Sequence, residues 1–261
     1  EISFLNSAIS LFAVALGAGA AGTLNMWYES DLDALMTRTC LRPIPTGKVT
    51  KNQALLFGIL LSFFSVSLLF YSSNFLSALL LLFTICFYFF VYTVWLKRRT
   101  VQNIVIGGAA GALPPVIGWT VVTGSLSLEP LILFLIIFLW TPSHFWALSL
   151  YKSKDYKKAK IPMLPVIYGQ EKTKKNIFVY SILMLPVVSA PYYLNFASNV
   201  YFFPSLILTI YYTYLCASLV KTKKSKISNL IAKKIFVFSI FYLFSIFLLI
   251  LMDNFFNLIY G

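Results

Sequence analysis

The chain has 261 residues, of which 59% are hydrophobic and only 11% are charged, and its mean hydropathy is +0.83. Soluble domains contain roughly 25% charged residues, so this composition excludes a soluble protein and predicts an all-α integral membrane protein. In such a protein the formal net charge of +13 first reports membrane topology, and nucleic acid is not an expected partner.

Eight apolar runs are long enough to cross a bilayer as helices, for which about 20 residues are needed. They cover residues 2–28, 53–70, 75–95, 103–122, 130–150, 177–194, 200–220 and 235–252. The pair Pro114-Pro115 should break or bend the fourth helix. No basic segment precedes the first run, so we expect it to be a spanning helix of a chain whose beginning is missing, and not a signal peptide.

The segments that connect these helices alternate in charge. Segments 29–51, 96–102, 151–175 and 221–234 contain all 21 Lys and Arg residues, whereas 71–74, 123–129 and 195–199 contain none. The positive-inside rule places the basic segments in the cytoplasm, so Glu1 lies outside and a cytoplasmic start would require a further helix upstream. We expect Lys172, Lys174 and Lys175 to be solvated near anionic lipid.

A cluster of polar residues at the end of the first helix is the first candidate site. Its members are Asn25, Glu29, Asp31 and Asp33. Three of them form one stripe on a helix, and Asp31 joins them only if the helix ends or unwinds here. Mg²⁺ is commonly held by one or two carboxylates together with substrate phosphates, which Arg38 and Arg42 could bind. The alternative is a solvated loop whose acids pair with these arginines, and the spacing does not decide between the two.

The basic segment after the fifth helix is the second candidate. Its single acid, Asp155, lies among Lys152, Lys154, Lys157 and Lys158. One carboxylate is a poor metal site alone, but with these lysines it could complete a diphosphate pocket begun by the first cluster. The alternative is an ordinary basic loop. In the short segment 96–102, anchoring on the cytoplasmic side explains the charges, including that of Lys97, and Gln102 and Asn103 at the start of the next helix are candidate helix caps or substrate contacts.

The only histidine, His144, lies in the fifth helix. On a continuous helix His144, Tyr151 and Asp155 would lie within about 20° of one face, with His144 roughly 16 Å deeper than Asp155. A neutral imidazole at that depth could bind haem iron or carry a proton. It could equally form a hydrogen bond to a neighbouring helix and have no chemical role.

With these residues in view, the chain resembles the UbiA-type membrane prenyltransferases over essentially its whole length. The resemblance is carried by residues 25–33, 36–39, 42–45, 92–100, 102–108, 140–147, 155–156 and 161–165. The run around His144 and the run Ile161-Pro-Met-Leu-Pro165 point to the branch of the family that farnesylates haem. Glu29 stands where the family usually has Asp, and the second motif has one acid, Asp155, where other members have two or more.

The resemblance implies a fold and a location. The fold is a ring of transmembrane helices around a central cavity, with eight helices in this chain, nine in the full protein and the first one missing. It would be one prenyltransferase domain over residues 1–261. The implied location is the bacterial inner membrane, as a multi-pass protein whose Asp-rich motif faces the cytoplasm. Haem A synthase or terminal-oxidase assembly is the implied protein partner.

The resemblance also implies a reaction, in which the farnesyl group of farnesyl diphosphate is transferred to a vinyl group of haem b with Mg²⁺ as cofactor. The implied metal-binding and catalytic residues are Asn25, Glu29, Asp31 and Asp33, with Asp155 as a further metal ligand. The implied diphosphate-binding residues are Arg38, Arg42, Lys97, Lys152, Lys154, Lys158 and Asp155. The implied haem-binding residues are His144 and Tyr151.

Two other functions stay open. The first is a prenyltransferase of the same family with another acceptor, such as a quinone precursor or a chlorophyllide. The second is a carrier of haem or lipid diphosphate that catalyses no reaction.

Overall fold

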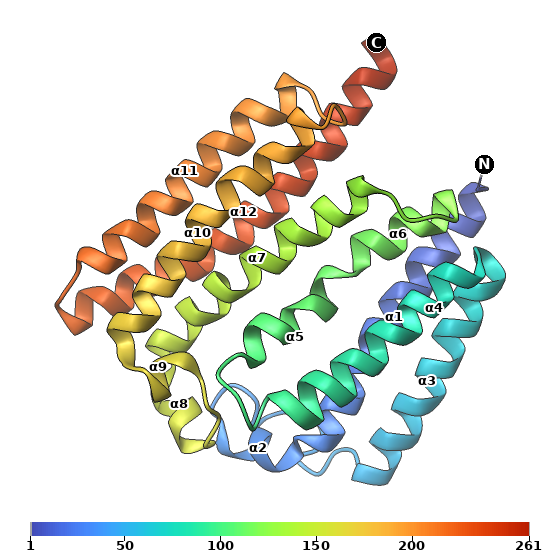
Figure 1. Ribbon diagram of the computed structural model, residues 1–261. Coiled ribbons are helices and arrows are strands. Elements are labelled where there is room, and N and C mark those ends of the chain that lie inside the picture. Colours follow the sequence, from blue (N-terminus) through green and yellow to red (C-terminus); the bar gives the residue numbers. More distant parts are fainter. Residues whose placement is uncertain (1, 261) are drawn as a thin grey trace. The chain divides into compact units, whose positions relative to one another are not determined.

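The structure is a computed structural model that describes residues 2–260, and within them it is built from helices without a β-strand (Figure 1). Eight helical segments in this described part are long and apolar enough to cross a membrane, which confirms the predicted class. They cover Phe4–Tyr28, Lys51–Ser72, Phe75–Leu96, Asn103–Thr123, Leu128–Tyr151, Gly169–Tyr193, Asn199–Lys221 and Ser225–Phe256. The helices group into two compact units, described in turn.

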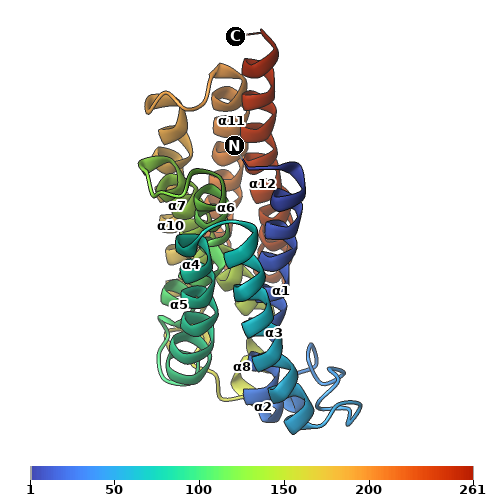
Figure 2. The same ribbon diagram turned by 90° about the vertical axis from the view of Figure 1, so that its right-hand side faces the viewer.

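The first unit contains the chain up to Pro130 and returns for Lys154–Pro162. Its elements are α1 (Phe4–Tyr28), α2 (Ser30–Leu35), α3 (Lys51–Ser72), α4 (Phe75–Cys86), η1 (Phe87–Leu96), α5 (Asn103–Ala112), α6 (Pro114–Thr123) and most of α8 (Ser153–Lys158). Helices α1, α3 and α4 contact one another and lie side by side in both views (Figures 1 and 2).

Small residues allow these helices to approach closely. A Cβ added to Gly17 of α1 would lie 2.7 Å from Leu81 of α4, and one added to Gly58 of α3 would lie 2.8 Å from Leu24 of α1. Lipid is as apolar as a leucine side chain, so close van der Waals packing, and not burial from water, holds membrane helices together. Gly17 therefore allows α1 and α4 to pack closely.

The fourth helix breaks where the sequence predicts. Helix α5 ends at Ala112, Leu113 interrupts it, and α6 begins with Pro114 at its first position. Proline is accepted at a helix start because its missing N–H would have no intrahelical partner there. Two side chains of the α3–α4 region then secure α6, since Asn74 Nδ2 donates to Thr120 O (2.7 Å) and the Ser77 and Thr120 hydroxyls lie 3.0 Å apart.

The third spanning helix changes its winding halfway, because α4 continues into the π-helix η1. Within η1 the Thr93 hydroxyl donates to Tyr88 O (2.9 Å), five residues back. The Tyr92 ring lies so close to α5 that a Cβ on Gly107 would be 2.1 Å from Tyr92 Cδ2. Gly107 is thus required for η1 and α5 to pack as they do, and π-helical turns often mark functional sites.

The second unit contains Leu131–Ser153 and Met163 onward. Its elements are most of α7 (Leu128–Tyr151), α9 (Leu164–Ile167), α10 (Gly169–Tyr193), α11 (Asn199–Lys221) and α12 (Ser225–Tyr260). Helix α11 contacts both α10 and α12 (Figure 1). Buried tyrosines fill the interior of this unit. The rings of Tyr212 and Tyr242 stack with their centroids 5.1 Å apart, and the hydroxyls of Tyr212 and Ser143 form a hydrogen bond (2.7 Å).

Several predicted boundaries were wrong. Helix α10 begins at Gly169 and α12 at Ser225, well before residues 177 and 235, because a helix can continue into polar sequence beyond the apolar core. Lys174 is buried, not solvated, and its ammonium donates to Glu171 Oε1 and Thr222 O, both at 2.8 Å. Helix α7 ends at Tyr151, so His144 and Asp155 do not share one continuous helix as assumed.

The glycine contact between α5 and η1 gives a matched pair of variants. Gly107→Ala should lower the free energy of unfolding by about 1–3 kcal/mol, since the new methyl group overpacks against Tyr92. Gly111→Ala, in the same helix, meets nothing within 4 Å and should leave stability unchanged or slightly higher. Thermal unfolding in detergent measures both, and equal midpoints for the two variants would contradict the close approach.

Candidate functional site

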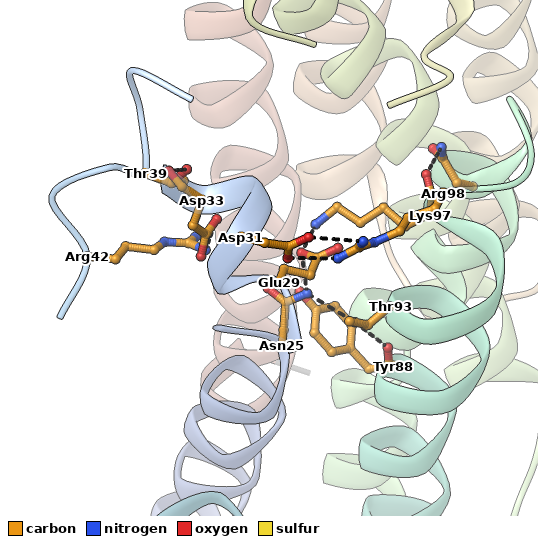
Figure 3. A network of polar contacts seen from close by, with 11 residues as sticks. Asn25, Glu29, Asp31, Asp33, Thr39, Arg42, Tyr88, Thr93, Lys97 and Arg98 are labelled. Atoms are coloured by element: carbon orange, nitrogen blue, oxygen red, sulfur yellow. Dashed lines mark hydrogen bonds and ion pairs between the residues drawn. The ribbon is translucent and has the colours of Figure 1, made fainter. Parts of the chain in front are cut away.

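The first cluster forms where α1 gives way to α2. Glu29 ends α1 and lies outside helical geometry (φ −101°, ψ 14°), although its N–H still bonds to Asn25 O at 2.9 Å. The interruption turns the acids in different directions: Glu29 and Asp31 point toward the end of η1, whereas Asp33 points toward the loop after α2 (Figure 3). Helix α1 therefore ends here. From the sequence, this was the condition under which Asp31 could join the site.

Glu29 is the most enclosed acid of the cluster, with 1% of the residue exposed. Its Oε2 accepts from Lys97 Nζ and from Asn25 Nδ2 (2.8 Å), so Asn25 and Glu29 do share one face. The Asn25 amide also donates to Thr93 Oγ1 of η1 (3.1 Å). Glu29 Oε1 is buried and has no hydrogen-bond partner among residues 2–260, which leaves one carboxylate oxygen available.

Asp31 forms the outer ion pair of the cluster. Arg98 donates to its two oxygens at 2.9 and 3.2 Å, and the Asp31 side chain is 57% exposed. Partial burial opposes ionisation of this carboxyl, but the hydrogen bond and the positive charge of Arg98 outweigh it and lower the pKa of Asp31 below its ordinary value of 3.8. Asp31 is therefore ionised at neutral pH.

Asp33 forms an ion pair with Arg42. The solvated-loop alternative predicted such pairs for both Arg38 and Arg42. Arg42 Nη1 lies 2.9 and 2.8 Å from the two Asp33 oxygens, and Asp33 itself is buried. The Thr39 hydroxyl donates to Asp33 O (3.0 Å) and so fixes the loop that carries Arg42. Arg38 forms no ion pair within the described residues.

The second motif joins the first inside the same unit. The Thr37 hydroxyl donates to Asp155 Oδ2 at 2.6 Å, although the two residues are 118 positions apart. Next to it, burial raises the pKa of the Tyr156 phenol, while the charges of Arg38 and Lys97 act to lower it. The charges of Arg38, Lys97 and Asp155 thus all act on Tyr156, which places segments 37–38, 97 and 155–156 around one site.

The donor set fits a divalent cation, although the acids are engaged otherwise in this structure. No group of three His, Cys, Asp or Glu side chains is positioned to hold a metal within residues 2–260, because each acid faces a different basic partner. However, the buried oxygens without a partner in that part include Glu29 Oε1 and Asn103 Oδ1, and hard oxygen donors suit Mg²⁺. The metal ligands stay a prediction.

His144 lies in the second unit, where its ring is held on three sides. It stacks on Trp140 (4.3 Å between centroids) and on Phe236 (4.5 Å), and its Nδ1 lies 2.6 Å from Ser239 Oγ. The Ser239 hydroxyl donates its proton to Phe236 O (2.7 Å), so it accepts from His144 Nδ1–H. Nε2 then carries the lone pair and is the nitrogen that can bind a metal or a proton.

The other predicted residues are placed less distinctively. The Tyr151 ring meets the edge of Phe236 (6.1 Å), so Tyr151 and His144 contact the same side chain. Lys152 is exposed in the second unit, and Lys154 and Lys158 are exposed in the first. Their roles in diphosphate binding, like that of Tyr151 in haem binding, stay predictions.

The site also contains residues to which the sequence assigned no role in binding or catalysis. They are Thr37, Thr93, Arg98 and Tyr156, whereas Asn103 was expected as a helix cap or substrate contact. Arg98 and Tyr156 could have been suspected from their neighbours Lys97 and Asp155. Thr37 and Thr93 had no signal, because their contacts join segments far apart in the sequence.

The chain matches known proteins over nearly all of its length. Residues 1–243 match the model of the UbiA prenyltransferase family. A protoheme IX farnesyltransferase of Pelagibacter ubique is 67% identical over 97% of this chain and 84% of that protein. One of Parvibaculum lavamentivorans is 51% identical over 94% of this chain and 77% of that protein.

Solved structures show the same fold at low sequence identity. A structure of digeranylgeranylglyceryl phosphate synthase has a TM-score of 0.79 at 21% identity, covering 97% of this chain and 87% of the other. A UbiA homologue from Archaeoglobus fulgidus bound to DMAPP and Mg²⁺ has a TM-score of 0.72 at 19% identity, covering 96% and 89%.

The two neighbouring basic residues should differ in their effect on stability. Lys97→Met should lower the free energy of unfolding by about 3–5 kcal/mol, because it leaves the buried Glu29 carboxylate without its counter-charge. Arg98→Met should cost at most about 1 kcal/mol, since its pair with Asp31 is exposed. Chemical unfolding in detergent measures both, and similar losses would show that burial does not distinguish the two pairs.

The Asp31–Arg98 contribution should depend on pH. Because the folded-state pKa of Asp31 is lowered, the stabilisation is complete above the ordinary value of 3.8 and disappears as the pH falls through the lowered pKa. The stability difference between the unmodified chain and Arg98→Met should be constant near neutral pH and vanish in strong acid. A difference that persists in acid would contradict an ionic origin.

Proposed function

The chain belongs to the UbiA prenyltransferase family, and we propose that it transfers the farnesyl group of farnesyl diphosphate to a vinyl group of haem b, giving haem O and diphosphate. The naming of its relatives as protoheme IX farnesyltransferases supports haem as the acceptor over a quinone precursor or chlorophyllide. It also supports an enzyme over a carrier.

One observation carries the proposal, namely the joining of both polar motifs in one unit by Thr37 and Asp155. This contact brings the acids at the end of α1 together with the cations Arg38 and Lys97 and the Tyr156 phenol. Such a site holds an anion through its cations and a metal through its carboxylates. A diphosphate with its metal ion requires both.

The carboxylates and Asn25 would hold Mg²⁺, with Glu29 Oε1 as an oxygen already buried and unpaired within the described residues. The A. fulgidus homologue was solved with Mg²⁺ and a prenyl diphosphate, which supports the same cofactor here. When bound, Mg²⁺ neutralises charge that develops on the departing diphosphate. Asp155, held by Thr37, is the ligand offered by the second motif.

The cations act on the leaving group. The bond between farnesyl C1 and oxygen breaks, diphosphate leaves with the electron pair, and the vinyl carbon of haem b bonds to C1. Water then adds to the resulting cation and releases a proton. Arg38 has no ion pair in the part of the chain that the structure describes, so its guanidinium is available to bind the diphosphate oxygens.

An apolar cavity of about 290 Å³ in the first unit suits the farnesyl chain. It is lined mainly by small and aliphatic side chains of α1, α4 and α5, including Ala21, Leu81 and Ala110, and Tyr88 also borders it. Tyr88 O accepts from Thr93, which in turn accepts from Asn25 in the polar site. An apolar wall around a developing allylic cation excludes water.

In the second unit, His144 would hold the haem through Nε2, since Ser239 fixes the proton on Nδ1. A hydrogen bond of this kind to the second ring nitrogen orients imidazole ligands of metals. Trp140 and Phe236 hold the ring plane. Tyr151 contacts Phe236 and would line the same haem site.

The proposed location is the bacterial inner membrane, with the polar site on the cytoplasmic side. All 21 Lys and Arg residues lie in the segments expected on that side, including 29–51 and 151–175, which carry the two motifs. This side also supplies farnesyl diphosphate and Mg²⁺. The product haem O would pass to haem A synthase or to terminal-oxidase assembly.

Asp33→Ala should abolish formation of haem O, because it removes a buried carboxylate of the first motif. Membranes containing either form are incubated with Mg²⁺, farnesyl diphosphate and haem b, or with an aromatic acid as competing acceptor, and the products are identified by mass. Comparable thermal unfolding of the two forms controls for folding. Normal turnover by Asp33→Ala would contradict the metal role, and prenylation of the aromatic acid alone would contradict the acceptor.

His144→Ala should weaken haem b binding at least about tenfold, since it removes the proposed nitrogen ligand. Ser239→Ala keeps the imidazole but removes the hydroxyl that fixes its tautomer, so its effect should be smaller. Haem titration followed by Soret absorption measures both. An unchanged Soret spectrum in His144→Ala would show that His144 is not a ligand.

A further inference from the structure

Each acid of the first motif is paired with a base, and two of the three bases come from another segment of the chain. The pairs are Glu29–Lys97, Asp31–Arg98 and Asp33–Arg42. Three carboxylates and three cations make the cluster neutral as it stands. A neutral cluster attracts a free cation weakly, because the cation must displace an ammonium or guanidinium that is already bonded.

The competition is strongest at Glu29. Its carboxylate is 1% exposed, so water cannot replace a lost partner, and Lys97 Nζ supplies the opposite charge directly at Oε2. The pairs at Asp31 and Asp33 involve more exposed arginines and are more strongly screened. Lys97 is therefore the main barrier to a cation entering the cluster.

Two buried atoms near the Glu29–Lys97 pair lack hydrogen-bond partners in the described part of the chain. They are Glu29 Oε1 and Asn103 Oδ1. The Asn103 side chain is held next to Lys97, because its Nδ2 donates to the backbone oxygen of Lys97 (3.3 Å). Buried polar atoms are normally satisfied, and two such exceptions beside one ion pair point to a ligand.

The Lys97 ammonium would have a second partner if an anion bound nearby. Its charge already acts on Tyr156, which is adjacent to Asp155 and within reach of Arg38. An anion held by Arg38 would offer Lys97 a new partner there. Movement of one flexible side chain would then free Glu29.

We propose that Lys97 is a placeholder for the metal: it neutralises Glu29 in the empty site and transfers to the diphosphate when metal and diphosphate arrive together. This inference rests on the proposed function only in taking a metal-bound diphosphate as the ligand. Lys97 is thus a positioning residue for Glu29 before binding and an anion ligand after it. Metal and diphosphate consequently bind cooperatively, since each removes the cost of displacing Lys97 for the other.

The test measures Mg²⁺ binding to the full chain in detergent by calorimetry, without and with inorganic pyrophosphate. In the unmodified chain, pyrophosphate should raise Mg²⁺ affinity about tenfold or more. In Lys97→Met, Mg²⁺ alone should bind about tenfold more tightly than to the unmodified chain, and the pyrophosphate enhancement should be correspondingly smaller. Mg²⁺ also binds pyrophosphate in solution, so a titration of pyrophosphate without protein is measured separately and accounted for in the arm that contains pyrophosphate.

Arg99→Met is the matched control, because Arg99 is exposed, lies in the same loop and forms no ion pair with an acid in residues 2–260. It should bind Mg²⁺ alone as the unmodified chain does and retain the enhancement. If Lys97→Met binds Mg²⁺ with unchanged or weaker affinity, the proposal is overturned. An equal gain in Arg99→Met would also overturn it, by showing a general charge effect.

Two further measurements address folding of the variant. Without metal, Lys97→Met should unfold at a lower temperature than the unmodified chain, and Mg²⁺ alone should raise its midpoint by more. Lys97→Arg preserves the positive charge and should retain the enhancement of Mg²⁺ affinity by pyrophosphate. Loss of this enhancement in Lys97→Arg would overturn the proposal that a cationic side chain moves from Glu29 to the diphosphate. None of these measurements uses haem or farnesyl diphosphate, so a failure to form haem O would overturn the proposed function and leave this result standing.

Discussion

The buried carboxylate of Glu29 imposes the constraint on which the first unit depends. An ionised group removed from water at the end of a membrane-spanning helix is strongly unfavourable unless a charge and hydrogen bonds compensate it. The chain meets this requirement with Lys97 and Asn25. Lys97 follows η1 and precedes α5, so these elements must be held where its ammonium reaches the end of α1.

The packing of η1 against α5 supplies that position. Gly107 lets the Tyr92 ring approach α5 far more closely than any side chain would allow, and Thr93, one residue on, accepts from Asn25. Both residues lie in the π-helix η1, where Tyr92 contacts Gly107 and Thr93 contacts Asn25. A glycine in the apolar part of the unit thus contributes to the geometry of ions at its polar end.

The sequence predicted the helices better than the pairs between them. The eight spanning helices of the described residues, the break at Pro114 and the common face of Asn25 and Glu29 follow from apolar runs and from helical periodicity, which are local properties. The Glu29–Lys97 and Thr37–Asp155 contacts join residues 68 and 118 positions apart, and they depend on packing that no local pattern contains. The burial of Lys174 was missed for the same reason, since its partner Thr222 lies in another helix connection.

Buried ionisable groups in this chain differ in how completely they are satisfied, and the difference separates structure from function. Asp253, in the second unit, is as buried as Glu29, but both of its oxygens accept hydrogen bonds, from the Ser198 N–H (2.8 Å) and hydroxyl and from the Tyr201 N–H (3.2 Å). It secures the start of α11, where a negative charge is favourable. Glu29 instead keeps one oxygen without a partner within residues 2–260. Because an unpaired buried oxygen lowers stability, its presence beside the Lys97 counter-charge is best explained by a ligand that completes the site.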